Sequence, residues 1–180
     1  MRRTPAYDAT FAAAIFAAPF DQLVRGLKYR AQLSFAPLLA ELIADRVADA
    51  WRDDAPTRRP RLDLLIPIPL SRNRLAERGF NQALELARPL SKKLGIAVDA
   101  ASTLRIRDTP PQAMLPFDER KKNIRDAFAV RDSHRAKLAG LRIGVVDDVM
   151  TTGSTLDEFA ATLKRAGAAN VVNLVVARTP

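Results

Sequence analysis

Apolar residues follow two patterns that alternate along the chain. Continuous apolar runs cover 10–17, 62–69, 141–148 and 170–177, and runs of this length are typical of strands buried on both faces. Between the runs lie segments whose apolar residues repeat with the period of a helix that turns one face to the core. The alternation predicts an α/β fold with a mostly parallel sheet flanked by helices.

Four helices are predicted from these segments. Residues 20–30 and 35–51 carry amphipathic stripes, a third helix begins after its cap Asn81, and a fourth covers 154–165. Pro89 lies inside the third helix and is expected to kink or split it, because proline lacks the amide that a helix interior needs.

Two short strands are predicted at 102–107 and 127–130. The residues between them, 108–123, form a long charged loop broken by prolines. Loops of this length within a compact domain are usually functional or mobile. We therefore expect this loop to contribute to function.

The chain is long enough to bury one good core, and the polar segment 53–60 is the only predicted linker. We expect one compact unit made of an N-terminal region, 1–60, and a core, 61–180. The apolar stretch 11–18 after a basic start resembles a short signal peptide. Asp8 and the amphipathic helix that follows favour a buried strand instead.

Composition excludes several functional classes. The chain has no cysteine and one histidine, so disulfides, thiolate metal sites, a histidine-based zinc site and a Ser-His-Asp triad are not expected. No apolar run approaches the roughly 18 residues of a membrane helix, and we expect a cytoplasmic location. The net charge of +9 favours an anionic partner, phosphate or nucleic acid, although an arginine-rich surface that serves only solubility has the same charge.

The stretch "VVDDVMTTGST" (145–155) carries the candidate chemistry. Asp147 and Asp148 end a predicted buried strand, and the predicted helix from Ser154 follows at once. Amides at a helix N-terminus bind phosphate, ligands bind at the carboxyl ends of parallel strands, and carboxylates accept hydrogen bonds from sugar hydroxyls. The combination indicates a ribose 5-phosphate site; the alternative is a helix cap and a loop carboxylate without a ligand.

Other phosphate motifs do not match. The chain has neither the Walker-type G-x-x-x-x-G-K-[ST] nor a G-x-G-x-x-G. A phosphoryl-aspartate enzyme needs D-x-D where this chain has adjacent acids, and a response regulator has its paired acids early in the chain without an anion loop.

"VVDDVMTTGST" resembles the signature of type I phosphoribosyltransferases, which bind phosphoribosyl pyrophosphate (PRPP). Two further stretches, "IPIPLSRNRLAERGFNQ" (66–82) and "TPPQAMLPFDERKKNIRDAF" (109–128), resemble the ComF (GntX-like) family. The resemblance extends from about Phe20 to the end of the chain and includes "LKYR" (27–30).

The resemblance implies a role for each matching residue. Asp147 and Asp148 would hold the ribose hydroxyls and Mg²⁺, directly or through water. The 5′-phosphate would be bound by Thr151, Thr152, Gly153, Ser154 and Thr155. Pyrophosphate would be met by the loop that follows the 62–69 strand, residues 70–74, with Ser71 and Arg72 as contacts. Arg74 and Arg78 also match the family motif, although a solvated arginine cluster is the alternative. The catalytic loop would carry Arg120, Lys121 and Lys122, which also fit an exposed charge run.

Two departures from related proteins limit what the resemblance implies. Many ComF-like proteins begin with a cysteine-paired zinc module; this chain has no cysteine, so zinc is not expected. Purine-salvage relatives have an acid where Thr151 stands, and threonine cannot assist proton transfer to a base. The resemblance therefore does not favour a purine acceptor, and the acceptor stays unidentified.

Two classes of function follow. The first is a phosphoribosyltransferase that uses PRPP and Mg²⁺ and releases pyrophosphate. The second is a non-catalytic PRPP- or nucleic-acid-binding accessory protein of DNA uptake (competence), with single-stranded DNA as partner. Only 6% of residues are aromatic, which does not favour a stacking platform for single strands. The sequence leaves a homo-oligomeric state open.

Overall fold

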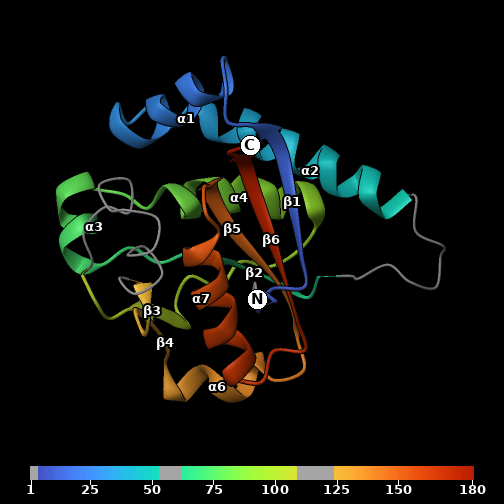
Figure 1. Cartoon of the computed structure of the whole chain (residues 1–180), viewed down its shortest axis with the longest axis vertical. Coiled ribbons are helices and arrows are strands. Elements are labelled where there is room, and N and C mark those ends of the chain that lie inside the picture. Colours follow the sequence, from blue (N-terminus) through green and yellow to red (C-terminus); the bar gives the residue numbers. More distant parts are fainter. Residues whose placement is uncertain (1–3, 53–61, 109–123) are drawn as a thin grey trace.

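A computed structural model describes residues 4–52, 62–108 and 124–180. Its main sheet has four parallel strands in the order β1-β6-β5-β2 (Figure 1). The strands are β1 (Ala9–Ile15), β2 (Leu64–Pro67), β5 (Arg142–Met150) and β6 (Asn170–Arg178). The prediction of a mostly parallel sheet is confirmed, and all four strands end at the same edge.

Helices cover both faces of this sheet (Figure 1). The helices are α1 (Phe20–Tyr29), α2 (Phe35–Arg52), α4 (Gln82–Leu94) and α7 (Ser154–Arg165). Leu39 and Leu86 of α2 and α4 pack with Val146 of β5 in one buried cluster. Phe159 of α7 packs with Val145 in a second cluster. Neighbouring residues of β5 thus face different cores, as strand alternation requires.

The N-terminal region contributes to the main sheet. Strand β1 pairs in parallel with β6, with Ala9 opposite Val172 and Ile15 opposite Arg178. The N-terminal strand is therefore an edge of the same sheet whose other edge is β2. No helix in the described part of the chain is long and apolar enough to cross a membrane.

A second, antiparallel sheet lies beside the main one. It consists of β3 (Thr103–Arg105) and β4 (Phe128–Val130), followed by the short helix α6 (Asp132–Leu138). Both strands were predicted, whereas α6 was not. Seven residues with a single buried apolar side chain, Leu138, are too few for a periodic pattern.

One local prediction was wrong, and a second was wrong in part. Residues 70–74 were expected to form a loop, but helix α3 (Arg72–Arg78) begins within them. Ser71 caps α3 by accepting a hydrogen bond from the Arg74 amide, and Gly79 ends it in the left-handed conformation. Pro89 does not split α4, which continues through it and keeps a buried apolar face on both sides of the proline.

Candidate functional site

The two acids near the end of β5 emerge on opposite faces of the sheet. Asp147 lies on the same face as Val145, towards α7, and lines a cavity of about 30 Å³ with residues of the loop that follows β5. Asp148 lies on the face of Val146, where Lys28 Nζ of α1 is 3.1 Å from its Oδ2. Both carboxylates, which are predicted to hold the hydroxyls of one ribose, lie near the end of β5 but have different surroundings.

Asp148 is almost fully covered. Its Oδ1 accepts a hydrogen bond from the Val149 amide at 2.9 Å. Its Oδ2 is buried and accepts no hydrogen bond of good geometry within the described residues, so the Lys28 ammonium is its partner as an ion pair. The carboxylate charge of Asp148 raises the pKa of Lys28, against the opposing effect of burial. Lys28 therefore stays charged and neutralises Asp148.

Asp147 has a different electrostatic environment. Its Oδ1 accepts a hydrogen bond from the Asp148 amide at 2.8 Å. Burial, followed by the charge of Asp148, raises the pKa of Asp147 to about 8. Asp147 thus holds its proton to a higher pH than an ordinary carboxyl group does. A carboxyl group with so perturbed a pKa, at a strand end and beside a helix N-terminus, is a candidate functional group.

The loop 151–155 leads into the N-terminus of α7. Gly153 is the N-cap residue, with φ of 75° and no capping side chain. A side chain here would be strained, and its Cβ would lie 2.7 Å from Met150 Cε. The hydroxyls of Thr152 and Ser154 are 3.0 Å apart, and the Ser154 amide is 3.4 Å from Thr152 Oγ1. Amides of the first turn have no intrahelical acceptor and are available to an anion.

Four predicted pyrophosphate residues lie on or beside α3. Ser71 is buried, and its hydroxyl donates to Asp108 Oδ1 at 2.7 Å. Ser71 and Arg72 line a cavity of about 780 Å³ between α3, α4 and β3. Arg74 follows in the first turn of α3. Arg78 donates to Gln82 at 2.5 Å, and its guanidinium lies 5.8 Å from the centre of the Tyr29 ring.

Sequence reasoning missed two cations, Lys28 and Arg105. Lys28 belongs to "LKYR", which was noted only as part of a resemblance. Arg105 lies on β3 and lines the larger cavity. Burial and then the charge of Arg74 lower the pKa of Arg105, whereas the charges of Asp108 and Asp147 act in the opposite direction. Arg105 is thus close enough to Arg74 of α3 and to Asp147 of β5 to sense their charges.

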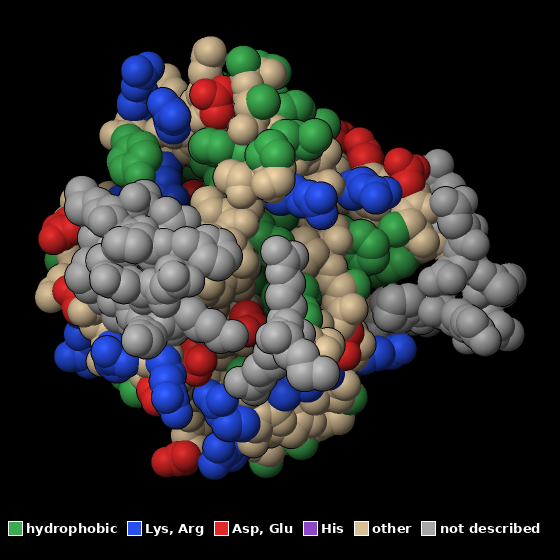
Figure 2. Space-filling view, viewed as in Figure 1, with side chains coloured by type: hydrophobic (Ala, Val, Ile, Leu, Met, Phe, Trp, Pro, Cys, Tyr) green, Lys and Arg blue, Asp and Glu red, His purple; other side chains and the backbone are tan. Residues whose placement is uncertain are grey.

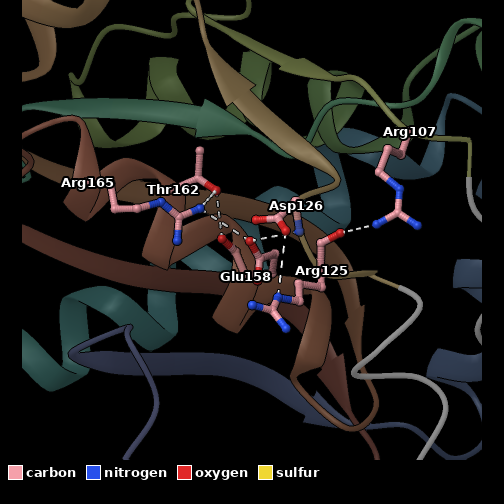
Figure 3. A network of polar contacts seen from close by, with 6 residues as sticks. All are labelled: Arg107, Arg125, Asp126, Glu158, Thr162 and Arg165. Carbon is pink, nitrogen blue, oxygen red and sulfur yellow. Dashed lines mark hydrogen bonds and ion pairs between the residues drawn. The ribbon is translucent and has the colours of Figure 1, made fainter.

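Polar contacts connect the two ends of the predicted functional loop to α7 (Figure 3). The Arg107 guanidinium donates to the carbonyl of Arg125, so residues on either side of the loop touch. The Asp126 amide donates to Glu158 of α7 at 3.3 Å, and Arg165 donates to the same carboxylate oxygen at 3.3 Å. Arg120, Lys121 and Lys122 lie outside the described residues, so their catalytic role stays a prediction.

The structure thus brings the predicted site residues that it describes to two neighbouring strand ends. The acid pair and loop 151–155 lie at the carboxyl end of β5, and Ser71 with the arginines of α3 lies after β2, the strand that pairs with β5. Parallel α/β sheets bind ligands at such an edge.

Comparison with known proteins identifies the family to which the chain belongs. Residues 80–180 match the phosphoribosyl transferase domain. A DNA utilization protein YhgH of Salmonella typhi is 35% identical over 179 residues, which cover 99% of this chain and 76% of that protein. Competence protein F of Haemophilus influenzae is 32% identical over 168 residues, covering 93% of this chain and 71% of that protein. The chain therefore belongs to the ComF-like family of type I phosphoribosyltransferases.

Two solved structures also align with most of this chain. The glutamine PRPP amidotransferase from B. subtilis, complexed with ADP and GMP, aligns with a TM-score of 0.49 and 18% identity over 78% of this chain and 26% of that chain. A purine phosphoribosyltransferase from Pyrococcus horikoshii aligns with a TM-score of 0.41 and 20% identity over 79% and 84% of the two chains.

Proposed function

We propose that the protein binds PRPP together with Mg²⁺ and transfers the phosphoribosyl group to an acceptor, releasing pyrophosphate. The observation that carries this proposal is the position of Asp147 and Asp148 at the end of β5, directly before the glycine-capped N-terminus of α7. Carboxylates for ribose hydroxyls then lie beside amides for a 5′-phosphate. This arrangement matches the ligand chemistry of the family to which the chain belongs.

The site residues act by holding the ligand in position and by stabilising its negative charges. Loop 151–155 and the first turn of α7 hold the 5′-phosphate through backbone amides, with the hydroxyls of Thr152 and Ser154 beside them. An acceptor nucleophile forms a bond to C1 of the ribose while the bond from C1 to pyrophosphate breaks. Arg72 and Arg105 provide donors and positive charge where the negative charge of the leaving group grows, and Ser71 donates there when its hydroxyl turns from Asp108.

The residues present fit Mg²⁺ that arrives with PRPP. The described part of the chain has no group of three or more His, Cys, Asp or Glu side chains able to hold a metal. Mg²⁺ is commonly held by one or two carboxylates while substrate phosphates and water complete its coordination. Asp147 and Asp148 supply such carboxylates, and bound Mg²⁺ would neutralise charge on the pyrophosphate.

A binding titration and a turnover assay test the proposal. Calorimetry with PRPP and Mg²⁺ should show saturable binding to the wild-type protein, with Asp45→Asn, an exposed change on α2, as a matched control. A screen of amine and nucleobase acceptors should then reveal pyrophosphate release. Absence of PRPP binding contradicts the proposal; binding without pyrophosphate release for any acceptor contradicts only the transfer step.

The names of the relatives favour a second candidate, a non-catalytic accessory protein in DNA use. DNA utilization protein and competence protein are names of relatives that match over most of this chain. Figure 2 shows Lys and Arg side chains in several separate groups on one face, with Asp and Glu among them. A salt titration with single-stranded DNA tests this candidate: electrostatic binding should weaken by 10³-fold or more between about 50 and 200 mM salt.

A further inference from the structure

The C-terminal end of α1 touches two residues of the candidate site. Lys28 Nζ lies 3.1 Å from Asp148 Oδ2, and the ring of the next residue, Tyr29, lies under the Arg78 guanidinium at 5.8 Å. Asp148 is predicted to hold a ribose hydroxyl and Arg78 to meet pyrophosphate. Two consecutive residues of one helix are therefore attached to groups that the proposed ligand needs.

In the part of the chain that the structure describes, the rest of α1 is held by apolar packing and not by polar contacts with the site. Its apolar side chains, Val24 and Leu27, are buried in the cluster that α1 shares with α2. Tyr29 is 72% exposed, so its contact with Arg78 lies at the surface and not in a core. Among the described residues, Lys28 has one polar partner, Asp148. The ion pair is thus the polar connection from α1 to the acid pair of β5.

The ion pair with Lys28 blocks the access of a ligand to Asp148. The side chain of Asp148 is only 4% exposed, whereas that of Lys28 is 27% exposed. The oxygen that faces Lys28 is buried and has no hydrogen bond. A sugar hydroxyl can donate to this oxygen only after the ammonium has moved aside. Lys28 has a long, flexible and partly exposed side chain, so it is the partner that can move aside.

We propose that Lys28 is a positioning residue that holds Asp148 in the free protein, and that a phosphoribosyl ligand takes Asp148 from Lys28 and loosens the end of α1. This inference rests on the proposed function and adds a competition between α1 and ligand for one carboxylate. The contact between the Tyr29 ring and the Arg78 guanidinium is a second link between α1 and the site. This link breaks when Arg78 binds the phosphate groups of the ligand.

Affinity measurements on matched variants test the competition. Lys28→Met removes the ammonium, so PRPP with Mg²⁺ should bind about three- to tenfold more tightly than to a control that loses the same charge at the C-cap of α1. Arg30→Gln is this control, because Arg30 is an exposed residue two positions away. Lys28→Arg keeps a cation and should restore the wild-type affinity. Equal or weaker binding to Lys28→Met than to Arg30→Gln overturns the proposal.

Hydrogen exchange of α1 amides gives a readout that does not depend on activity. Without ligand, exchange in α1 should be faster in Lys28→Met than in wild type or Arg30→Gln. With PRPP and Mg²⁺, the α1 amides of wild type should exchange faster than in the free protein. Unchanged exchange in free Lys28→Met, or slower exchange in α1 on ligand binding, overturns the role of Lys28. Failure of wild type and every variant to bind PRPP instead contradicts the proposed function.

Discussion

Replacing Asp147 by Asn should change how stability depends on pH. The pKa of Asp147 is raised to about 8 in the folded protein from an ordinary value of 3.8, because burial and the charge of Asp148 oppose ionisation. A group whose folded pKa is raised binds its proton more tightly when folded. Its contribution to stability is therefore complete below about pH 4 and is lost as the pH rises towards 8. Because Asn cannot ionise, the Asp147→Asn variant should not lose stability in this way as the pH rises.

The magnitude follows from linkage. One proton held by the folded but not the unfolded chain changes the free energy of unfolding by about 1.36 kcal/mol per pH unit. Between pH 5 and 8 a single ideal group would therefore cost about 4 kcal/mol. Lys28 lowers the pKa of Asp147 in part, and local relaxation reduces the cost. Between pH 5 and 8, we expect the free energy of unfolding of Asp147→Asn to rise by about 2–4 kcal/mol relative to that of wild type.

Urea unfolding at pH 5, 6, 7 and 8 measures this difference. The free energies of unfolding of wild type and Asp147→Asn should be closest at pH 5 and diverge as the pH rises. Asp45→Asn, a change of the same type at an exposed position of α2, should stay parallel to wild type. A constant offset between Asp147→Asn and wild type across the four pH values would refute the assigned environment of Asp147.

Three further variants test the loop and α3. Gly153→Ala should lower the free energy of unfolding by about 1–2 kcal/mol, because φ is 75°. Gly95→Ala is its control and should lower the free energy of unfolding by a similar amount, because φ is 68° and nothing lies near its Cβ. PRPP binding should weaken only in Gly153→Ala. Thr152→Val should weaken PRPP binding less than about tenfold, because backbone amides make most of the phosphate contacts; a larger loss in calorimetry contradicts this. Ser71→Ala should cost about 1 kcal/mol in urea unfolding through the lost cap of α3; unchanged stability contradicts the cap.

The main elements of the fold were readable from the sequence because they obey strong local rules. The strands of the main sheet are continuous apolar runs, and Asn81 does cap α4 by accepting amide hydrogen bonds. Helix α3 has no buried side chain, so no apolar stripe marks it, and its start was taken as a loop. Pro89 was expected to disturb α4, but the buried face of this helix outweighs one lost hydrogen bond.

The residue types of the candidate site were also predictable, whereas their partners were not. "VVDDVMTTGST" is a contiguous motif, and the acids, the glycine and the hydroxyls keep their order at the end of β5 and the start of α7. Lys28 is 120 residues from Asp148 in the chain, and no local pattern relates them. That contact depends on how α1 packs on α2 above the strand ends, which is a property of the tertiary structure.

The central claim is that Asp147, Asp148 and the N-terminus of α7 form one phosphoribosyl site. Calorimetric titration of PRPP with Mg²⁺ into wild type and the Asp147→Asn/Asp148→Asn variant tests it most directly, with thermal unfolding to confirm that the variant is folded. The account predicts saturable binding to wild type and a loss of about tenfold or more in the variant, since each charged hydrogen bond contributes about 1.5–3 kcal/mol. A folded variant that binds PRPP as tightly as wild type would contradict it.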